Sequence, residues 1–383
     1  MQFRTIFLIT TAFVIFYTLL CVSRVVSSHQ LLGVLTSIAA TSFILWMQLF
    51  RRRAYKETYY EWILAWGSSF GLGVWSSFVI YCVLVDGINL LLVIAQLLGM
   101  DSLAGFDRIY WVSTGIKLAF IASLVTSFIG LLQAGKGPIV RRITVPVDSL
   151  PEELIGLRIV QISDLHIGVI IKKNYIEKVV DKVLALAPDI IAITGDLGDG
   201  KPQELHLYTQ PLAALIAPLG TYYVTGNHEY YFGAVSWIAE AQRLGLTPLI
   251  NENRVLDYRQ RKIMVAGVTD ITAHHFIPDH YSDPHTAVAS DLKCDVRILL
   301  AHQPESYVEA QAAGFDIQLS GHTHAGQYFP FSLLIRLGKR YARGLHFHKT
   351  LWIYVNSGTG FWGAANRFGI PAEITLIELA KGL

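Results

Sequence analysis

The apolar and polar positions divide the chain into two parts. Up to about residue 134 the sequence is mostly apolar, whereas from about residue 150 onward short apolar runs alternate with polar segments. A helix that crosses a membrane needs about 20 apolar residues in a row. The first part contains four stretches of roughly that length or longer, at 6–23, 31–50, 63–99 and 111–133. We therefore expect an all-α transmembrane bundle of about four helices over residues 1–140.

Two of these stretches need interpretation. Residues 6–23 could be a signal peptide, but the only charged residue before them is Arg4, no A-x-A cleavage site follows, and further apolar stretches come next. A retained helix is therefore favoured. The stretch 63–99 is too long for one span, and the piece that follows Asp86 is too short to cross a membrane. We expect one span near 66–88, with Asp86 close to the membrane boundary, and then an interfacial or re-entrant piece.

Lysine and arginine residues between the apolar stretches predict the orientation of the chain. Residues 51–56, RRRAYK, carry four positive charges, and the loop 100–110 carries one. The last stretch is followed by Lys136, Arg141 and Arg142. Such charges gather on the cytoplasmic side of a membrane. With four spans, the N-terminus, the basic loop and the polar part all lie in the cytoplasm, whereas a fifth span would put the polar part outside and break this agreement.

The polar part predicts an α/β domain over residues 150–383. Its apolar runs have the length and β-branched content of buried strands, and helical patterns near 173–187, 203–216 and 235–245 separate the earlier ones. Strands that alternate with helices form a central sheet. The later runs have fewer helices between them, so we expect a mixed or double sheet. The main runs lie within 157–166, 189–200, 221–230, 296–304, 316–324 and 351–360.

Several of these runs end in Asp, His or Asn beside Gly. In open α/β sheets, ligands bind at the carboxyl ends of the strands. We therefore expect side chains from several strand ends to meet at one edge of the domain. The candidate residues are Asp164, His166, Asp196, Asp199, Asn227, His228, His302, His322 and His324.

Composition narrows the chemistry of this edge. The net charge of +2 is too balanced for a nucleic-acid-binding protein. The three cysteines form no CxxC motif, which excludes a thiolate-rich zinc site. Carboxylate, imidazole and amide donors suit Mn, Fe, Zn or Mg. The donors are too many for one ion and enough for two, and a carboxylate such as Asp196 can bridge two cations, as in the two-metal clamps of phosphate-ester hydrolases.

Five motifs, in this order, resemble those of the calcineurin-like metallophosphoesterase superfamily and of its membrane-anchored, YkuE-like subgroup: SDLH, GDLGDG, GNHE, AHQP and GHTHAGQ. The resemblance covers about 157–379, and the motifs are specific together although each alone would be weak. It implies a four-layer α/β/β/α sandwich with two mixed sheets between helices. It also implies hydrolysis of a phosphodiester or pyrophosphate bond by a hydroxide that two divalent metal ions activate, with Mn²⁺ favoured over Fe, Zn or Mg.

The resemblance also assigns roles to the motif residues. The first ion would be held by Asp164, His166, Asp196 and His324. The second ion would be held by Asp196, Asn227, His302 and His322, so that Asp196 bridges the pair. His228 would contact the phosphate and protonate the leaving oxygen, and Asp199 would orient a ligand. His274 and His275 match no motif, and a surface position is favoured for them over contacts with the substrate.

The segment 328–344 bears on the identity of the substrate. It combines an apolar run with four basic residues, Arg336, Lys339, Arg340 and Arg343. Beside the active edge, such a segment would lie on the bilayer and meet lipid phosphates, whereas the alternative is a solvated amphipathic loop that packs on its own domain. We therefore favour the lipid bilayer as a partner, and as substrate a phospholipid or a lipid-linked molecule such as UDP-2,3-diacylglucosamine, which relatives of this fold hydrolyse.

Two alternatives to this interpretation remain open. The substrate could be a soluble nucleotide or a phosphoprotein, because the motifs specify the bond and not the molecule. The protein could also be a non-catalytic membrane sensor or scaffold that binds a phosphorylated lipid. A catalytically inactive fold is disfavoured because none of the expected ligands is replaced.

Overall fold

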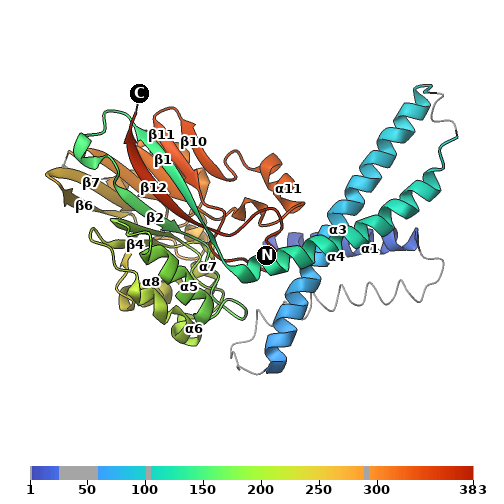
Figure 1. The fold of residues 1–383 in the computed structure, drawn as a ribbon, viewed down its shortest axis with the longest axis horizontal. Coiled ribbons are helices and arrows are strands. Elements are labelled where there is room, and N and C mark those ends of the chain that lie inside the picture. Colours follow the sequence, from blue (N-terminus) through green and yellow to red (C-terminus); the bar gives the residue numbers. More distant parts are fainter. Residues whose placement is uncertain (1, 26–58, 101–104, 289–292, 383) are drawn as a thin grey trace.

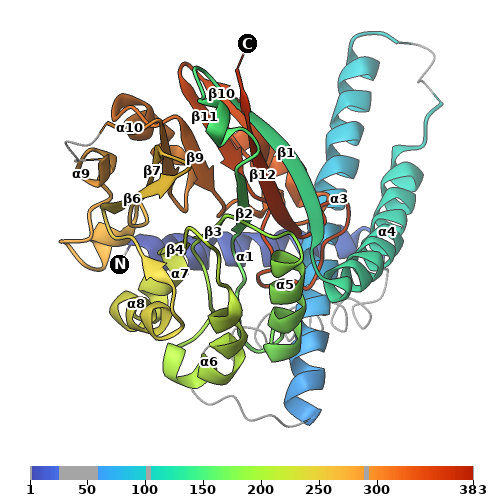
Figure 2. The ribbon, with the colours of Figure 1, turned by 60° about the vertical axis from the view of Figure 1, so that its left-hand side comes forward.

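The computed structural model describes residues 2–25, 59–100, 105–288 and 293–382 of the chain. Its N-terminal part is helical and its C-terminal part is built on two sheets (Figure 1). The helices of the first part are α1 (Gln2–Ser23), α3 (Tyr59–Leu97) and α4 (Arg108–Lys136). Helices α3 and α4 lie side by side and extend away from the sheets (Figures 1 and 2). All three helices share a small apolar core, to which they contribute Cys21, Phe78, Cys82, Ile116 and Ala119.

The expected count of about four spans is not found. Among the described residues, two helices are long and apolar enough to cross a membrane, Trp62–Leu97 and Arg108–Lys136. The first expected span, 6–23, falls on α1, but its apolar part with described side chains, Thr11–Ser23, is shorter than a span. The expected span at 31–50 lies outside the described residues.

The predicted break of the 63–99 stretch near Asp86 is wrong, because α3 is one continuous helix of 39 residues. Asp86 lies inside this helix and has two partners next to α1. Its carboxylate accepts a hydrogen bond from the Tyr17 hydroxyl at 2.7 Å and one from the Arg24 guanidinium at 2.5 Å. Asp86 is thus half-buried and paired with a cation, and the helix continues past it.

The sheet-containing part confirms the predicted mixed α/β architecture with two sheets. The first sheet has the order β1-β12-β2-β3-β4-β5. Its strands are β1 (Ile139–Val147), β12 (Glu373–Lys381), β2 (Arg158–Ile162), β3 (Ile190–Thr194), β4 (Thr221–Val224) and β5 (Thr247–Pro248). Strands β2 to β5 run parallel, and β12 is antiparallel to β2 but parallel to β1.

The second sheet has the order β10-β11-β9-β8-β7-β6. Its strands are β10 (Gly344–His348), β11 (Leu351–Val355), β9 (Ile317–Ser320), β8 (Val296–Leu300), β7 (Arg261–Gly267) and β6 (Glu252–Tyr258). The four inner strands run parallel, and β6 and β10 are antiparallel edge strands. Parallel inner strands bring their carboxyl ends to one edge, which is the geometry that the sequence predicted for the site.

Alternating side chains of the inner strands bury both faces of each sheet. Ile159 and Ile190 of the first sheet pack against Ile298 and Ile317 of the second, and this core joins the two sheets. The opposite face of the first sheet packs on α5 (Lys173–Leu184), α6 (Pro202–Thr209) and α8 (Ala234–Arg243), the three helices that the sequence predicted. The outer face of the second sheet packs on α9 (Pro284–Val288) and α10 (Tyr307–Ala312). Strands buried on both faces explain the continuous apolar runs of the sequence.

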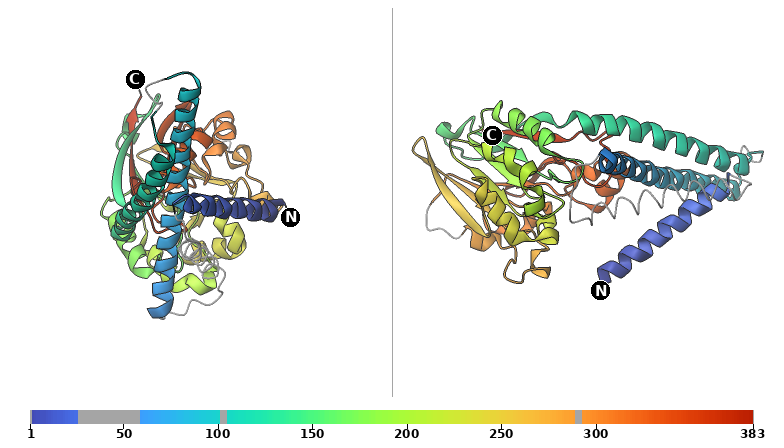
Figure 3. Two further views of the ribbon diagram at one scale, coloured as in Figure 1. Left: turned by 90° about the vertical axis from the view of Figure 1, so that its right-hand side faces the viewer. Right: turned by 90° about the horizontal axis from the view of Figure 1, so that it is seen from below.

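The loop 361–368 connects the sheets with α3 and α4 (Figure 3). The Ser69 hydroxyl of α3 donates to the carbonyl of Gly363 at 2.6 Å and accepts from the amide of Ala365 at 2.6 Å. The Arg367 amide donates to the carbonyl of Gly130 of α4 at 3.1 Å. A side chain at Gly130 would collide with the same loop, so this glycine permits the close approach. The helical part is therefore joined to a loop that, as shown below, reaches the functional site.

Candidate metal centre

The candidate donors lie in the loops that directly follow the inner strands. Asp164 follows β2, Asp196 follows β3, and His322 follows β9. Five of the donor residues have a left-handed backbone, which costs a non-glycine residue about 1–2 kcal/mol. Their φ angles are 54° for Asp164, 50° for His166, 55° for Asp196, 66° for His322 and 48° for His324. Strain concentrated in this way is typical of functional sites, where surrounding contacts hold residues in conformations that they would not adopt alone.

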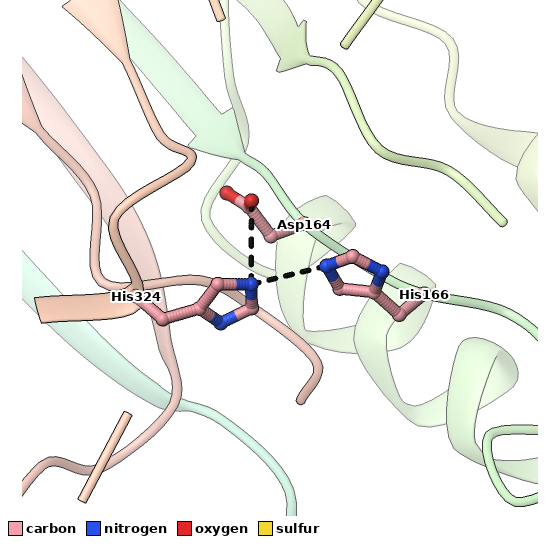
Figure 4. Close-up of side chains that lie close together, drawn as sticks. All are labelled: Asp164, His166 and His324. Atoms are coloured by element: carbon pink, nitrogen blue, oxygen red, sulfur yellow. Dashed lines mark hydrogen bonds and ion pairs between the residues drawn. The ribbon is translucent and has the colours of Figure 1, made fainter. Parts of the chain in front are cut away.

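The first group of donors is formed by Asp164, His166 and His324, all of which are buried (Figure 4). The Nε2 atoms of His166 and His324 face each other at 3.0 Å. An Asp164 carboxylate oxygen lies 3.4 Å from the same nitrogen of His324. Each neutral imidazole has a single N–H, so three electron-rich atoms converge with few protons between them. This arrangement suits a cation.

The second group of donors is formed by Asp196, His302 and His322, with Asn227 beside them. The Asn227 Oδ1 atom lies 3.1 Å from His302 Nε2 and 3.0 Å from His322 Nδ1. Asn227 is the first residue of the short helix α7 (Asn227–Phe232). The structure thus brings together all seven residues that the sequence predicted as ligands.

Asp196 lies between the two groups. Its Oδ2 atom is 3.8 Å from His166 Nε2 and 3.3 Å from His302 Nε2. One carboxylate therefore faces donors of both groups, which is the position that a bridging ligand requires. The structure holds this carboxylate by a hydrogen bond of 2.9 Å from the backbone amide of His228 to Oδ1.

His228 and His166 share one partner, Asp199. The Nδ1 atom of His228 lies 2.7 Å from Asp199 Oδ1, and the Nδ1 atom of His166 lies 2.8 Å from the same oxygen. Each ring therefore donates its Nδ1 hydrogen to Asp199, which leaves both Nε2 atoms directed into the site. The geometry agrees with the expectation that Asp199 orients a ligand.

The electrostatics of the site follow from carboxylates and imidazoles buried together. Burial would raise the pKa of Asp199, but His166 and His228 outweigh it and hold that pKa at about 2. Burial would lower the pKa of His228, but Asp196 and Asp199 raise it to about 9. The pKa of His322 is lowered to about 4 by burial and by His302. His322 is therefore neutral near pH 7 and offers a lone pair, as a metal ligand must.

Burial shifts the pKa values of His324 and Asp164 so that both groups favour their neutral forms. Burial, with His166 beside it, lowers the pKa of the His324 imidazole well below its usual range. Burial also raises the pKa of Asp164, despite the opposing effect of His302. The low pKa keeps His324 neutral, the form that binds a cation, and a cation beside Asp164 would reverse the raised pKa of that carboxyl group. Together with the nitrogen and oxygen donor set, this shows that the residues present fit divalent metal ions.

Two structural residues of the site were not predicted from the sequence. The Glu229 carboxylate accepts hydrogen bonds from the amides of Asp196, Leu197 and Gly226, and so ties together two donor loops. In the sequence, Glu229 is marked only as the last residue of the motif GNHE. Arg367 is fully buried and donates to the carbonyls of Ser357, Gly358 and Gly360, and its Nη2 atom lies 3.1 Å from His324 Nδ1. No short motif marks Arg367, since all its partners are distant in the sequence or in an irregular loop.

Two glycines of the motifs permit the close packing of the donor loops. A Cβ atom at Gly226 would collide with the Asp196 carboxylate, and a Cβ atom at Gly321 would collide with the Asp164 carboxylate. Gly226 of GNHE and Gly321 of GHTHAGQ therefore serve to bring backbone against a carboxylate rather than to form turns.

The basic residues of 328–344 lie outside the donor groups, on α11 (Phe331–Gly338) and the segment after it. Lys339 forms an ion pair of 2.6 Å with Glu305, and Arg343 lies 3.6 Å from the buried Glu373. Arg336 and Arg340 are exposed. Similarly, His274 is half-buried and His275 is exposed, and neither belongs to a donor group.

Comparison with known proteins gives a consistent family. A model of the calcineurin-like phosphoesterase family matches residues 157–326. The chain is 39% identical to a Bos taurus protein named transmembrane protein with metallophosphoesterase domain, over 68% of this chain and 62% of that protein. It is 36% identical to an uncharacterized metallophosphoesterase of Helicobacter pylori, over 69% of this chain and 70% of that protein. The structure of a calcineurin-like phosphoesterase, YfkN from Bacillus subtilis, aligns with a TM-score of 0.36 and 15% identity, over 54% of this chain and 82% of that one.

Proposed function

Because the chain belongs to the calcineurin-like metallophosphoesterases, we propose that it is a membrane-anchored hydrolase that cleaves a phosphodiester or pyrophosphate bond with two divalent metal ions as cofactors. The observation that carries this proposal is a cluster of three overlapping donor groups, two of which contain Asp196 and two of which contain His166. The matched stretch covers 62% of the length of the bovine relative. The proposed activity therefore rests on the residues of this chain and not on that protein. When bound, the ions would supply Lewis-acid neutralisation of the phosphoryl oxygens and lower the pKa of the attacking water.

The residues present divide between the two ions as their distances suggest. Asp196, the central carboxylate, would contact both ions. The first ion would be held by Asp164, His166, Asp196 and His324. The second ion would be held by Asp196, Asn227, His302 and His322. Mn²⁺ is the ion that we propose, with Fe, Zn and Mg as alternatives for the same donor set.

His228 is the residue that we assign to proton transfer. Asp199 fixes its Nδ1 atom, so its Nε2 atom is the one left to meet a substrate oxygen. The pKa of His228 is raised by the negative charge of Asp196 and Asp199, despite burial. Cations beside Asp196 would cancel part of that charge and lower this pKa toward neutrality. His228 can then release a proton to the leaving oxygen near pH 7.

A lipid-linked substrate is supported by the exposed face of α11. Leu333, Leu334 and Leu337 are exposed there, Leu337 by 87% of its surface. The segment before α11 is joined to α3, because the Tyr328 and Ser76 hydroxyls lie 2.7 Å apart. Figure 1 shows α11 between the sheets and the long helices. Exposed leucines beside a candidate membrane span, with Arg336 nearby, favour contact with the bilayer over packing on the domain itself.

A cytoplasmic position of the sheets is supported by the two long helices. Helix α3 begins and α4 ends beside the sheets, because Trp62 and Ala134 line one cavity with residues of α5. Lys136 ends α4 on the side of the sheets, and in the sequence the basic residues 51–56 precede α3, which begins at Tyr59. These positive charges support a cytoplasmic position of that side. A reporter that is active only outside the inner membrane, fused to the C-terminus, should stay inactive, and activity would refute this orientation.

The hydrolase proposal is tested with the purified full chain in detergent. With Mn²⁺ we expect hydrolysis of bis(p-nitrophenyl) phosphate, and loss of that hydrolysis in Asp196→Ala and His228→Ala. A panel of lipid phosphates and nucleotide-linked lipids, followed by mass spectrometry, then identifies the substrate. Cleavage of soluble nucleotides alone would refute the lipid-linked substrate. Full metal occupancy without cleavage of any phosphoester would instead favour a sensor or scaffold that binds phosphorylated lipid.

A further inference from the structure

We propose that the cavity between α3 and α5 binds the anionic headgroup of a membrane lipid, and that α3 forms one wall of the path from this cavity to the metal centre. The inference rests on the proposed phosphoesterase function, to which it adds a binding site and a class of substrate. That class is a lipid whose headgroup carries a second anionic group besides the phosphoester that is cleaved.

The cavity has a volume of about 670 Å³ and lies between the long helices and the first sheet's helical layer. Trp62 and Trp66 of α3 and Ala134 of α4 form one side. The N-terminal turns of α5, with Tyr208 of α6, form the other side. Figure 2 shows α5 facing the half of α3 that begins at Tyr59. A volume of this size is in the range of small-molecule binding sites.

The charges on the cavity wall have one sign. Among the described residues that line it, the charged ones are Lys172, Lys173 and Lys178. Lys173 also lies 3.7 Å from Glu177, an exposed pair that solvent screens, and Glu177 does not line the cavity. The Lys172 ammonium lies 5.6 Å from the centre of the Tyr208 ring. Three ammonium groups beside a candidate membrane span are a site for phosphate groups at a bilayer surface.

The rest of the wall is aromatic and apolar. The rings of Trp62 and Trp66 are 6.2 Å apart, and Trp66 is 6.4 Å from Phe361. Trp62 is 49% exposed, so it lies at the opening of the cavity. Tryptophans near the end of a spanning helix lie at the level of the lipid headgroups. Lysines on one side and tryptophans on the other match an amphiphile better than a free anion, because a free anion has no apolar part to contact the aromatic wall.

A second, smaller cavity lies between this one and the metal centre. It shares Ile170, Ile171 and Phe361 with the first cavity, and it is also lined by His166 and Asp199 of the site. Ala65 and Ser68 of α3 form its opposite wall. A headgroup held by the lysines can therefore extend along α3 toward the donor groups. The long helix thereby takes part in the active site as well as in anchoring.

The test uses tryptophan fluorescence of the full chain in nanodiscs, quenched by lipids with brominated acyl chains. We expect brominated phosphatidic acid to quench more strongly than brominated phosphatidylcholine, and Trp62→Phe to remove much of the difference. Lys173→Ala/Lys178→Ala should weaken the apparent affinity for phosphatidic acid about tenfold, since each exposed lysine adds to the attraction. The matched control Lys349→Ala/Lys381→Ala, at exposed lysines away from the cavity, should leave it unchanged.

Free glycerol 3-phosphate separates a lipid site from a simple phosphate site. It should fail to compete at concentrations equal to those of phosphatidic acid. Equal quenching by both lipids, no effect of the lysine variant, or competition by glycerol 3-phosphate as strong as that by the lipid would overturn the inference. Hydrolysis of bis(p-nitrophenyl) phosphate, measured in parallel, distinguishes the two proposals. If hydrolysis occurs without selective quenching, only this inference fails, whereas selective quenching without hydrolysis refutes the proposed function and leaves the lipid-binding site without a substrate role.

Discussion

The two sides of the active edge consist of different types of residues. The donor side consists of Asp, His and Asn in strand-end loops of the two sheets, and these charges hold one another in place through Asp196, Asp199 and Glu229. The opposite side consists of serines, glycines, aromatic rings and lysines, and part of it belongs to α3 and α4. The difference teaches that the candidate ligands come from the loops of the sheets and from α7, whereas α3 and α4 form part of the opposite wall.

Replacing the central carboxylate of Asp196 is expected to have the largest effect on metal binding and activity. In Asp196→Asn, both donor groups lose a shared anionic ligand, so we expect both metal ions to be lost and activity to fall by about three orders of magnitude or more. Metal content by plasma mass spectrometry and hydrolysis of bis(p-nitrophenyl) phosphate are the measurements. The exposed Asp181→Asn is the matched control. Normal metal content in Asp196→Asn would contradict its bridging position.

Variants of the two histidines of GHTHAGQ test whether the donor residues divide into two groups, one for each ion. His324 faces Asp164 and His166, whereas His322 faces Asn227 and His302. We expect His322→Ala and His324→Ala each to retain about one of two ions, and the double variant to retain none. A double variant that still holds one ion would mean that both histidines serve the same ion.

A change in α3 should test whether the helical side positions the site. Ser69→Ala leaves the Gly363 carbonyl and the Ala365 amide without their partner, which costs about 1–3 kcal/mol for buried groups. We expect faster hydrogen exchange in 361–368 and a severalfold loss of activity with metal content unchanged. Ser123→Ala is the control, because the Ser123 hydroxyl bonds only to a carbonyl of its own helix. Equal exchange in both variants would show that the loop does not depend on α3.

The smallest effect is expected from the exposed face of α11. Leu337→Ser removes a leucine that is 87% exposed, so the fold should keep its stability. Contact with the bilayer should weaken by about 1–2 kcal/mol, which lowers hydrolysis of a lipid substrate in vesicles about tenfold and leaves hydrolysis of bis(p-nitrophenyl) phosphate unchanged. Ile216→Ser, at another exposed apolar residue, is the control. An equal loss of hydrolysis with both substrates would mean that the substitution impairs folding and not contact with the bilayer.

The donor side could be predicted from the sequence because its information is local. Each ligand lies within a short motif at the end of an apolar run, and parallel strands bring such ends together. The helical side could not be predicted, because its information is distant. The continuity of α3 through Asp86 depends on Tyr17 and Arg24, more than 60 positions away. Arg367 reaches His324 only because α4 and the loop 361–368 pack together.

Strand β1 illustrates the same limit within the sheets. Its sequence, IVRRITVPV, breaks the alternation of apolar and polar residues at Arg141–Arg142 and contains Pro146, and it lies outside the runs that predicted strands. It forms because it lies at the edge of the first sheet, where exposed side chains are tolerated, and pairs in parallel with β12 from the far end of the chain. A pairing partner more than 200 positions away leaves no local signal.

The length of α3 fixes how the metal centre can meet its substrate. An α-helix rises about 1.5 Å per residue, so the 39 residues of α3 extend for about 58 Å, against about 30 Å for the hydrocarbon core of a bilayer. In the proposed membrane-anchored arrangement, roughly half of the length of α3 would extend beyond the hydrocarbon core as a rigid strut. A strut, unlike a flexible tether, would hold the metal centre at one height and one tilt. Encounters with the proposed lipid substrate would then become a search in two dimensions, whose rate is set by surface density and lateral diffusion rather than by bulk concentration.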